Sequence, residues 1–299
     1  MNVKKPNKHK AKLCIAISSR ALFNLDVEHD YFNEFGPDKY MQRQRELEKE
    51  PLAPGAAFGL VKKCLALNEI ANDNVEVILV SRNSLDTGIR IFNSIKHHNL
   101  NISRSCFCDG QSPFKYLASF RADLFLSQNQ EDVKLALEAN HAAARILPRT
   151  HNEQISDTLN IAFDGDAVIF SDESEKLYQS AGFNEFIKQE NAKAELPMSQ
   201  GPFAGFLRAI HELQKGMPPS NCPIKTALVT ARSAPAHERV IMTLRAWNIR
   251  LDEALFLGGL EKGSFLEAFK ADIFFDDQTI HCVSANKHVT TGQVIASDT

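Results

Sequence analysis

The chain has 299 residues, of which 43% are hydrophobic and 24% are charged, and its net charge at pH 7 is −3. These values are typical of a globular protein with a real core, and the length fits one large or two ordinary domains. The small negative charge excludes a general basic field, so we expect neither nucleic acid polymers nor membranes as partners. No apolar run reaches the ~18 residues of a membrane span, and Leu13–Ile17 is too short for a signal peptide. We therefore expect a cytoplasmic protein.

Short β-branched or aromatic runs alternate with helical patterns along the whole chain. Residues 1–12 are rich in lysine and predict a flexible basic arm. Strands are then predicted, in chain order, at Leu13–Ile17, Val75–Val80, Leu159–Phe163, Thr226–Val229, Ala254–Leu257 and Asp272–Phe275. Apolar residues recur at helical spacing in Phe203–Leu213 and in Val240–Trp247. This alternation favours an α/β fold with a parallel sheet.

The chain contains an internal repeat. Val75–Gln128 aligns with Ile224–Asp277 without a gap, and Leu79–Ser84 falls on Leu228–Ser233 within that match. We therefore predict two tandem Rossmann-like units that arose by duplication. The predicted units are residues 13–150 and 151–290, and a tail of residues 291–299 follows them.

The two copies differ in their charged residues. The second copy carries aspartates and a lysine where the first copy does not: Asp164, Asp166, Asp276, Asp277 and Lys262 align with Ser18, Arg20, Ser127, Gln128 and Pro113. A half without these carboxylates can neither hold a divalent cation nor form an acyl phosphate. Only the second half is therefore predicted to be catalytic.

The polar residues of the second half follow its predicted strands. Asp164-Gly165-Asp166 comes directly after Leu159–Phe163, Thr230 follows the next strand, and Asp276-Asp277 follows the last one. Lys262 lies in a turn with glycines on both sides. Because the carboxyl ends of parallel strands meet at one edge of a sheet, we expect these side chains to share one site.

Each residue type suits one step of phosphoryl transfer. Asp164 is the candidate nucleophile, because a carboxylate with a pKa of about 3.9 is ionised without an activating base. Asp166 would protonate the departing oxygen and later take a proton from water. Lys262 would neutralise charge on the phosphoryl group, and Thr230 with the backbone N–H of Ala231 would bind its oxygens. Carboxylates and a phosphate repel one another, so the site also predicts a cation, for which Mg²⁺ is the best match.

This order of motifs resembles that of the haloacid dehalogenase (HAD) superfamily of phosphotransferases. Four segments are similar, more closely, to signatures of the cytosolic 5′-nucleotidase I family: Phe163–Glu175, Leu228–Ser233, Phe256–Gly259 with the following Lys262, and Ile273–Gln278. Ile17–Phe23 in the first half is also similar to that family. The resemblance covers nearly the whole chain and implies two HAD-like units. It also implies Mg²⁺ ligands from Asp164, the backbone carbonyl of Asp166, and Asp277, with Asp276 holding the site indirectly or pairing with Lys262.

Residues 171–222 lie between the first two motifs and predict a small helical cap over the site. Side chains of this segment that could meet a nucleoside are Ser171, Asp172, Tyr178, Phe183 and Phe186. The alternative that the aromatic ones form the core of the cap stays open. Arg232 and Ser233, just past Thr230, are expected to bind ribose or phosphate.

The sequence thus predicts a Mg²⁺-dependent 5′-nucleotidase that acts through an aspartyl-phosphate, with AMP, IMP or deoxynucleotides as substrates implied by the resemblance. One alternative is the same chemistry on another phosphomonoester such as a sugar phosphate, or transfer to an alcohol. Another is a catalytically silent nucleotide-binding regulatory protein, which the intact pair Asp164 and Asp166 disfavours. The first half is expected to be a structural partner, a homo-oligomer surface, or a nucleotide-effector site that uses Arg20 or Arg82.

Overall fold

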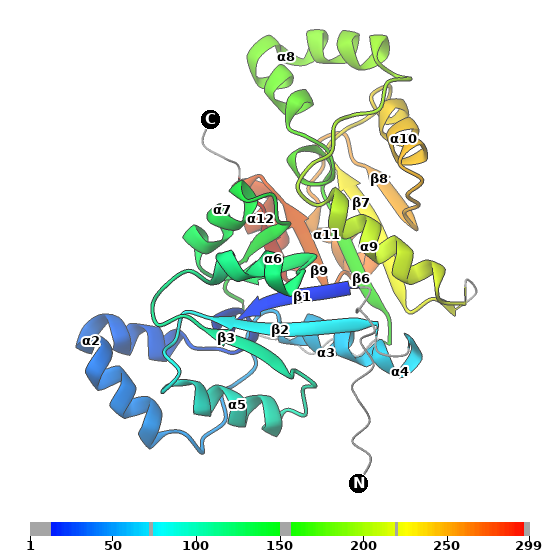
Figure 1. Cartoon of the computed structure of the whole chain (residues 1–299). Coiled ribbons are helices and arrows are strands. Elements are labelled where there is room, and N and C mark those ends of the chain that lie inside the picture. The colour runs from blue at the N-terminus through cyan, green and yellow to red at the C-terminus, as the bar shows by residue number, and fades with distance from the viewer. Residues whose placement is uncertain (1–12, 72–73, 150–156, 219–220, 296–299) are drawn as a thin grey trace.

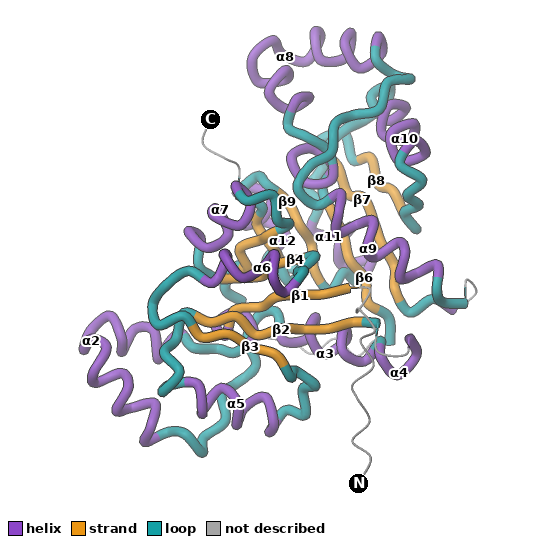
Figure 2. Tube along the Cα trace, viewed as in Figure 1, coloured by secondary structure: helices purple, strands orange, loops and turns teal. Residues whose placement is uncertain are grey.

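The computed structural model describes residues 13–71, 74–149, 157–218 and 221–295, so the predicted basic arm lies outside the described residues. The fold is mixed α/β, with a single sheet of ten strands within these ranges (Figures 1 and 2). The strands are β1 (Leu13–Ser18), β2 (Val75–Ser81), β3 (Arg104–Phe107), β4 (Leu124–Ser127), β5 (Ala143–Ile146), β6 (Leu159–Phe163), β7 (Ile224–Thr230), β8 (Glu253–Phe256), β9 (Ile273–Asp276) and β10 (Thr291–Gln293). The α-helices are α1 (Ser19–Leu22), α2 (Asp26–Glu46), α3 (Phe58–Ala66), α4 (Asn68–Ala71), α5 (Gly88–His97), α6 (Leu117–Phe120), α7 (Gln130–Glu138), α8 (Glu173–Ala192), α9 (Ala204–Lys215), α10 (His237–Ala246), α11 (Gly263–Phe269) and α12 (Thr279–Ala285).

All six predicted strands are present, with ends that shift by one or two residues. The sequence analysis missed β3, β4, β5 and β10, each of which has only three or four residues. The predicted tail at residues 291–299 was wrong at its start, because Thr291–Gln293 form β10 inside the sheet. This strand reads Thr-Gly-Gln and has no apolar pattern to reveal it. Position 292 has room only for glycine, since a Cβ would lie 2.8 Å from the ring of Phe275.

The sheet repeats one strand order twice. The first half has the order β3-β2-β1-β4-β5, and the second half has the matching order β8-β7-β6-β9-β10. The pairs within each half are parallel. The halves join through an antiparallel pair in which Gly292 faces Ile146 and Gln293 faces Arg145. The strands of the two halves therefore run in opposite directions, and their carboxyl ends lie at opposite edges of the sheet.

The core of the second half is built from phenylalanines on neighbouring elements. Phe163 of β6 stacks on Phe275 of β9, with ring centroids 5.6 Å apart. Phe203 and Phe206, at the start of α9, pack on both rings. The apolar periodicity that predicted this helix is thus the face that α9 buries on the sheet. The predicted cap range 171–222 consequently includes a helix of the core.

Two helices, α2 and α8, project away from the sheet. Figure 1 shows them at opposite ends of the molecule, α2 beyond the end of β1 and α8 beyond the end of β7. Each is broken at a glycine with a positive φ, Gly36 at 79° and Gly182 at 78°. These two glycines occupy equivalent places in the repeat, so each half has a kinked helix over the carboxyl ends of its strands.

Among the helices in the described ranges, none combines the length and the apolar character that would be needed to cross a membrane.

Candidate active site

Lys262 joins two of the predicted carboxylates. Its Nζ donates to Asp164 Oδ1 at 2.7 Å and to Asp276 Oδ2 at 2.6 Å. Asp164 directly follows β6 and Asp276 ends β9, two strands that pair in parallel. All three side chains are at least nine-tenths buried. The contact of Lys262 with Asp276 agrees with the expected pairing, and Lys262 also reaches the candidate nucleophile.

Asp277 completes a cluster of three acids. One carboxylate oxygen from each of Asp164, Asp276 and Asp277 lies within 4.8 Å of the others, a spacing that one metal ion can bridge. Three carboxylates around one lysine leave an excess of negative charge in a buried place. An all-oxygen donor set of this kind suits a hard divalent cation such as Mg²⁺. Asp276 thus joins the cluster directly, although the resemblance places it outside the metal's ligands.

The pKa values of these acids reflect burial and crowding. Burial raises the pKa of Asp164 to about 7 against the opposing charge of Lys262, and the charge of Asp276 adds to the rise. Burial, with the charges of Asp164 and Asp276, raises the pKa of Asp277 to about 8. Without a cation, the acids of this cluster therefore resist full ionisation. A bound divalent cation would favour their ionised forms.

Asp166 is not one of these three acids and binds Arg232. Nε and Nη2 of Arg232 donate to the two oxygens of Asp166, each at 2.7 Å. Nη1 of Arg232 donates to Glu190 on α8 at 2.5 Å, and Arg239 on α10 donates to the other oxygen of Glu190 at 2.8 Å. Ser174 also donates to Glu190 at 3.0 Å. This series of buried ion pairs links Asp166 to α8.

The expected role of Arg232 in binding ribose or phosphate stays a prediction, and in this structure its guanidinium binds protein carboxylates. Its side chain is 4% exposed, and Nε, Nη1 and Nη2 all have protein acceptors. The local sequence did not reveal this, because Glu190 lies 42 residues away. For Arg239, which also binds Glu190, the repeat carried a signal, since Arg90 at the equivalent place in the first half contacts Glu28 and Gln44.

The other predicted residues lie around the cluster. Thr230 is buried at the end of β7, Ala231 follows it at the surface, and Ser233 is half-buried just beyond. Asp172 precedes α8 and forms an ion pair with Lys176 at 2.9 Å. Ser171 and Asp172 also line a cavity of about 740 Å³, together with Ala167.

Two of the predicted aromatic residues, both on α8, pack on each other. Tyr178 is 48% exposed, whereas Phe186 is buried, and their rings pack edge to face at 6.0 Å. The guanidinium of Arg232 lies 5.4 Å from the ring centre of Phe186. The side chain of Phe183 is outside the described part of the chain. One predicted ring is therefore exposed and the other is packed on the buried ion pairs.

We expect Glu190→Gln to destabilise the protein at neutral pH by about 3 kcal/mol, because it leaves the buried Arg239 without its charged partner and Arg232 with Asp166 alone. Although burial opposes ionisation, Arg232 and Arg239 hold the pKa of Glu190 below its usual range in the folded state. That stabilisation is complete above the unfolded pKa of about 4.3 and is lost as the pH falls through the lower folded value. Urea unfolding at neutral pH and below pH ~4 should therefore show a gap between wild type and variant that narrows in acid.

Glu185→Gln is the matched control for that measurement. Glu185 lies on the same helix and forms an exposed 3.6 Å pair with Lys188, so its loss should have almost no effect. Equal destabilisation by both changes would mean that the buried pairs of Glu190 contribute no more than a surface contact.

Comparison with known proteins identifies the family of the chain. Residues 5–298 match the model of the 5′-nucleotidase family. Human cytosolic 5′-nucleotidase 1B is 37% identical to the chain over 94% of the chain and 48% of the human protein. The chain thus spans about half the length of this curated relative. Because the family match covers nearly all of the sequence, the chain belongs to the 5′-nucleotidase family.

Proposed function

We propose that the second half hydrolyses nucleoside 5′-monophosphates to a nucleoside and phosphate. The observation that carries the proposal is the buried cluster of Asp164, Asp276 and Asp277 with Lys262 at the carboxyl ends of β6 and β9. An oxygen of Asp164 attacks phosphorus, the bond from phosphorus to the 5′ oxygen breaks, and an aspartyl-phosphate forms. Water then attacks phosphorus, which releases phosphate and restores Asp164.

Asp166 is the proposed acid and base of these two steps. It gives its proton to the departing 5′ oxygen and takes one from the attacking water. Both of its oxygens are held by Arg232, so this role requires Arg232 to move away. Glu190 holds Arg232 from α8, and a change in the position of this helix would free Asp166. This contact supports a cap function for α8, with residues 171–200 as the segment that moves.

We propose Mg²⁺ as the cofactor, held by Asp164, the backbone carbonyl of Asp166, and Asp277. When bound, it would neutralise the carboxylates and the phosphate as they come together. Lys262 balances charge on Asp164 and would continue to do so on the phosphoryl group. Thr230 and the backbone N–H of Ala231 lie at the end of the adjacent strand, in reach of the phosphoryl oxygens.

The substrate class rests on the family and on the exposed ring of Tyr178, which can stack on a base. The name of the human relative also supports a cytosolic 5′-nucleotidase. We further propose that the two halves are HAD-like units that arose by duplication, which the repeated strand order supports.

Phosphate release from a panel of nucleoside 5′-monophosphates and sugar phosphates, with Mg²⁺ present, tests the function. We expect turnover of the nucleotides at least about 10-fold above that of the sugar phosphates, since an apolar ring contact adds ~1.4 kcal/mol or more to binding. Preference for sugar phosphates would favour the alternative phosphomonoesterase. Binding of nucleotides with no turnover at all would favour a silent regulatory protein.

A further inference from the structure

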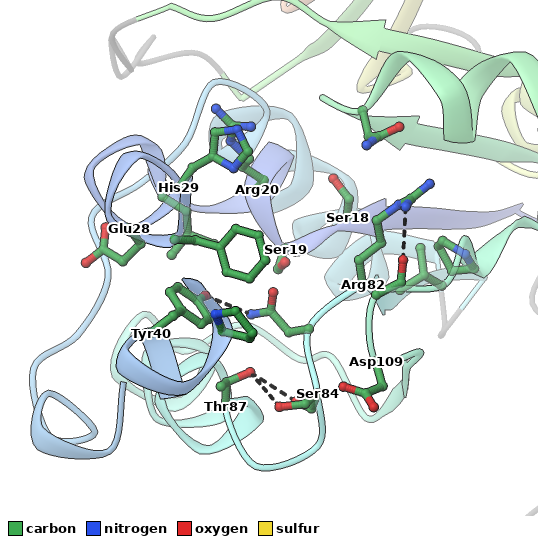
Figure 3. A pocket seen from close by; sticks show the side chains of 18 of the residues that line it. Ser18, Ser19, Arg20, Glu28, His29, Tyr40, Arg82, Ser84, Thr87 and Asp109 are labelled. Carbon is green, nitrogen blue, oxygen red and sulfur yellow. Dashed lines mark hydrogen bonds between the residues drawn. The ribbon is translucent and has the colours of Figure 1, made fainter. Parts of the chain in front are cut away.

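A cavity of about 610 Å³ lies in the first half, at the carboxyl ends of β1, β2 and β4 (Figure 3). This volume is within the ~300–1,000 Å³ range of sites for small molecules. Its floor carries hydroxyl and amide groups that follow the strands, among them Ser18, Ser19 and Asn83. The kinked helix α2 covers the cavity, and Figure 3 shows Tyr40 and His29 of that helix on the side opposite Arg82.

This cavity occupies the place of the active site in the other half. Ser18 ends β1 as Asp164 follows β6, and α2 covers the cavity as α8 covers the acids. The aromatic residues of the two helices also correspond. Phe32 and Tyr40 pack edge to face at 5.5 Å and 89°, while Tyr178 and Phe186 do so at 6.0 Å and 87°. The first half therefore has an aromatic pair of the same geometry as the second half, but the residues at the ends of its strands are different.

The floor lacks the groups that would hold a metal ion. The one group of three or more acidic, histidine or cysteine residues with metal-binding spacing, among those described, is that of the second half. The buried acids near the cavity are already neutralised, because Arg82 binds both oxygens of Asp132 and Arg90 pairs with Glu28 at 2.8 Å. Besides Arg20, Arg82 and Asp109, which also line it, the cavity offers an apolar ring surface and uncharged hydrogen-bonding groups.

We infer that this cavity binds the nucleoside part of a nucleoside or nucleotide, without a metal ion and without cleaving it. A base can lie against Phe32 and Tyr40, and the hydroxyls of a sugar can bond to the serine and asparagine side chains. No acid pair stands at Ser18 and Arg20 to attack a phosphate. The choice of a nucleoside rests on the proposed function of the second half, whose aromatic pair has the same geometry.

Calorimetric titration with adenosine and with AMP, in buffer containing EDTA, tests this site. Wild type should bind at least one of them, and Phe32→Asp should weaken that binding at least 10-fold. Phe35→Asp is the matched control on α2, because Phe35 is 40% exposed against 43% for Phe32 and does not line the cavity. It should bind as wild type does. Tighter binding of AMP than of adenosine would identify a nucleotide ligand, and equal affinity a nucleoside.

Tyr178→Asp separates this site from the active site, since Tyr178 holds the equivalent place in the second half. The metal-free binding should survive this change. The inference is overturned if wild type binds neither probe, if Phe32→Asp binds as wild type does, or if Tyr178→Asp alone removes the binding. Failure of the proposed function would instead appear as absent phosphate release with Mg²⁺, whatever the outcome of the titrations.

Discussion

Asp164→Asn is expected to lower phosphate release from nucleoside 5′-monophosphates by about 10⁴-fold or more, the scale of losing a covalent nucleophile. The amide keeps the shape of the side chain but cannot attack phosphorus. It also removes one of the three acids around the proposed cation site and one of the two charged partners of Lys262. Initial rates of phosphate release at saturating substrate and Mg²⁺ would measure the effect, with thermal unfolding as the check on folding.

Ser18→Asn is the control for that change, because Ser18 holds the equivalent place after β1 in the first half. It should leave turnover within about twofold of wild type, since the carboxyl ends of β1 and β6 lie at opposite edges of the sheet. Substantial turnover by Asp164→Asn would exclude an aspartyl-phosphate on this residue. A large loss in Ser18→Asn would mean that chemistry is shared between the halves.

Removal of divalent cations is expected to lower turnover by at least about 10³-fold, because a metal ion contributes several kcal/mol of charge stabilisation in such reactions. The physical reason is the crowding of three buried carboxylates, in which burial raises the pKa of Asp277 to about 8. Without a cation, a phosphate dianion would add further repulsion. Activity after treatment with EDTA, followed by titration with Mg²⁺, provides the measurement.

Asp277→Asn sharpens this test. It removes one proposed ligand while keeping a weaker oxygen donor, so activity should return only at Mg²⁺ concentrations at least about 10-fold higher. Asp172→Asn is the comparison, since Asp172 pairs with Lys176 outside the cluster and should leave the Mg²⁺ requirement unchanged. Full activity in EDTA would rule out the cation and leave the cluster without its proposed role.

Much of the candidate site could be predicted from the sequence. Asp164, Asp276 and Lys262 lie on three different segments, yet each follows a strand or opens the next helix, and parallel strands bring such ends together. Local patterns were therefore sufficient to assemble these groups. The repeat added the comparison with Ser18, which identified the half without the acids.

The contacts of Arg232 could not be predicted in this way. Its partner Glu190 lies on α8, whose polar sequence and break at Gly182 give no apolar face to define its position. A helix that is held by buried ion pairs leaves no periodic signal. β10 was not predicted for a similar reason. Gly292 and its neighbours form a strand because they pair with β5 and β9, and their own sequence has no strand pattern.

The antiparallel junction of β5 with β10 gives the molecule an approximate twofold rotation axis. The two binding sites would therefore open to solvent on different sides of the molecule. A product could not pass directly from the site of one half to the site of the other. Any communication between them would have to be mechanical, carried by small shifts of the shared sheet. Ile146, which faces Gly292 at the junction, is the natural position at which a substitution would test this coupling, because a side chain at Gly292 would strike the ring of Phe275 in the core of the second half.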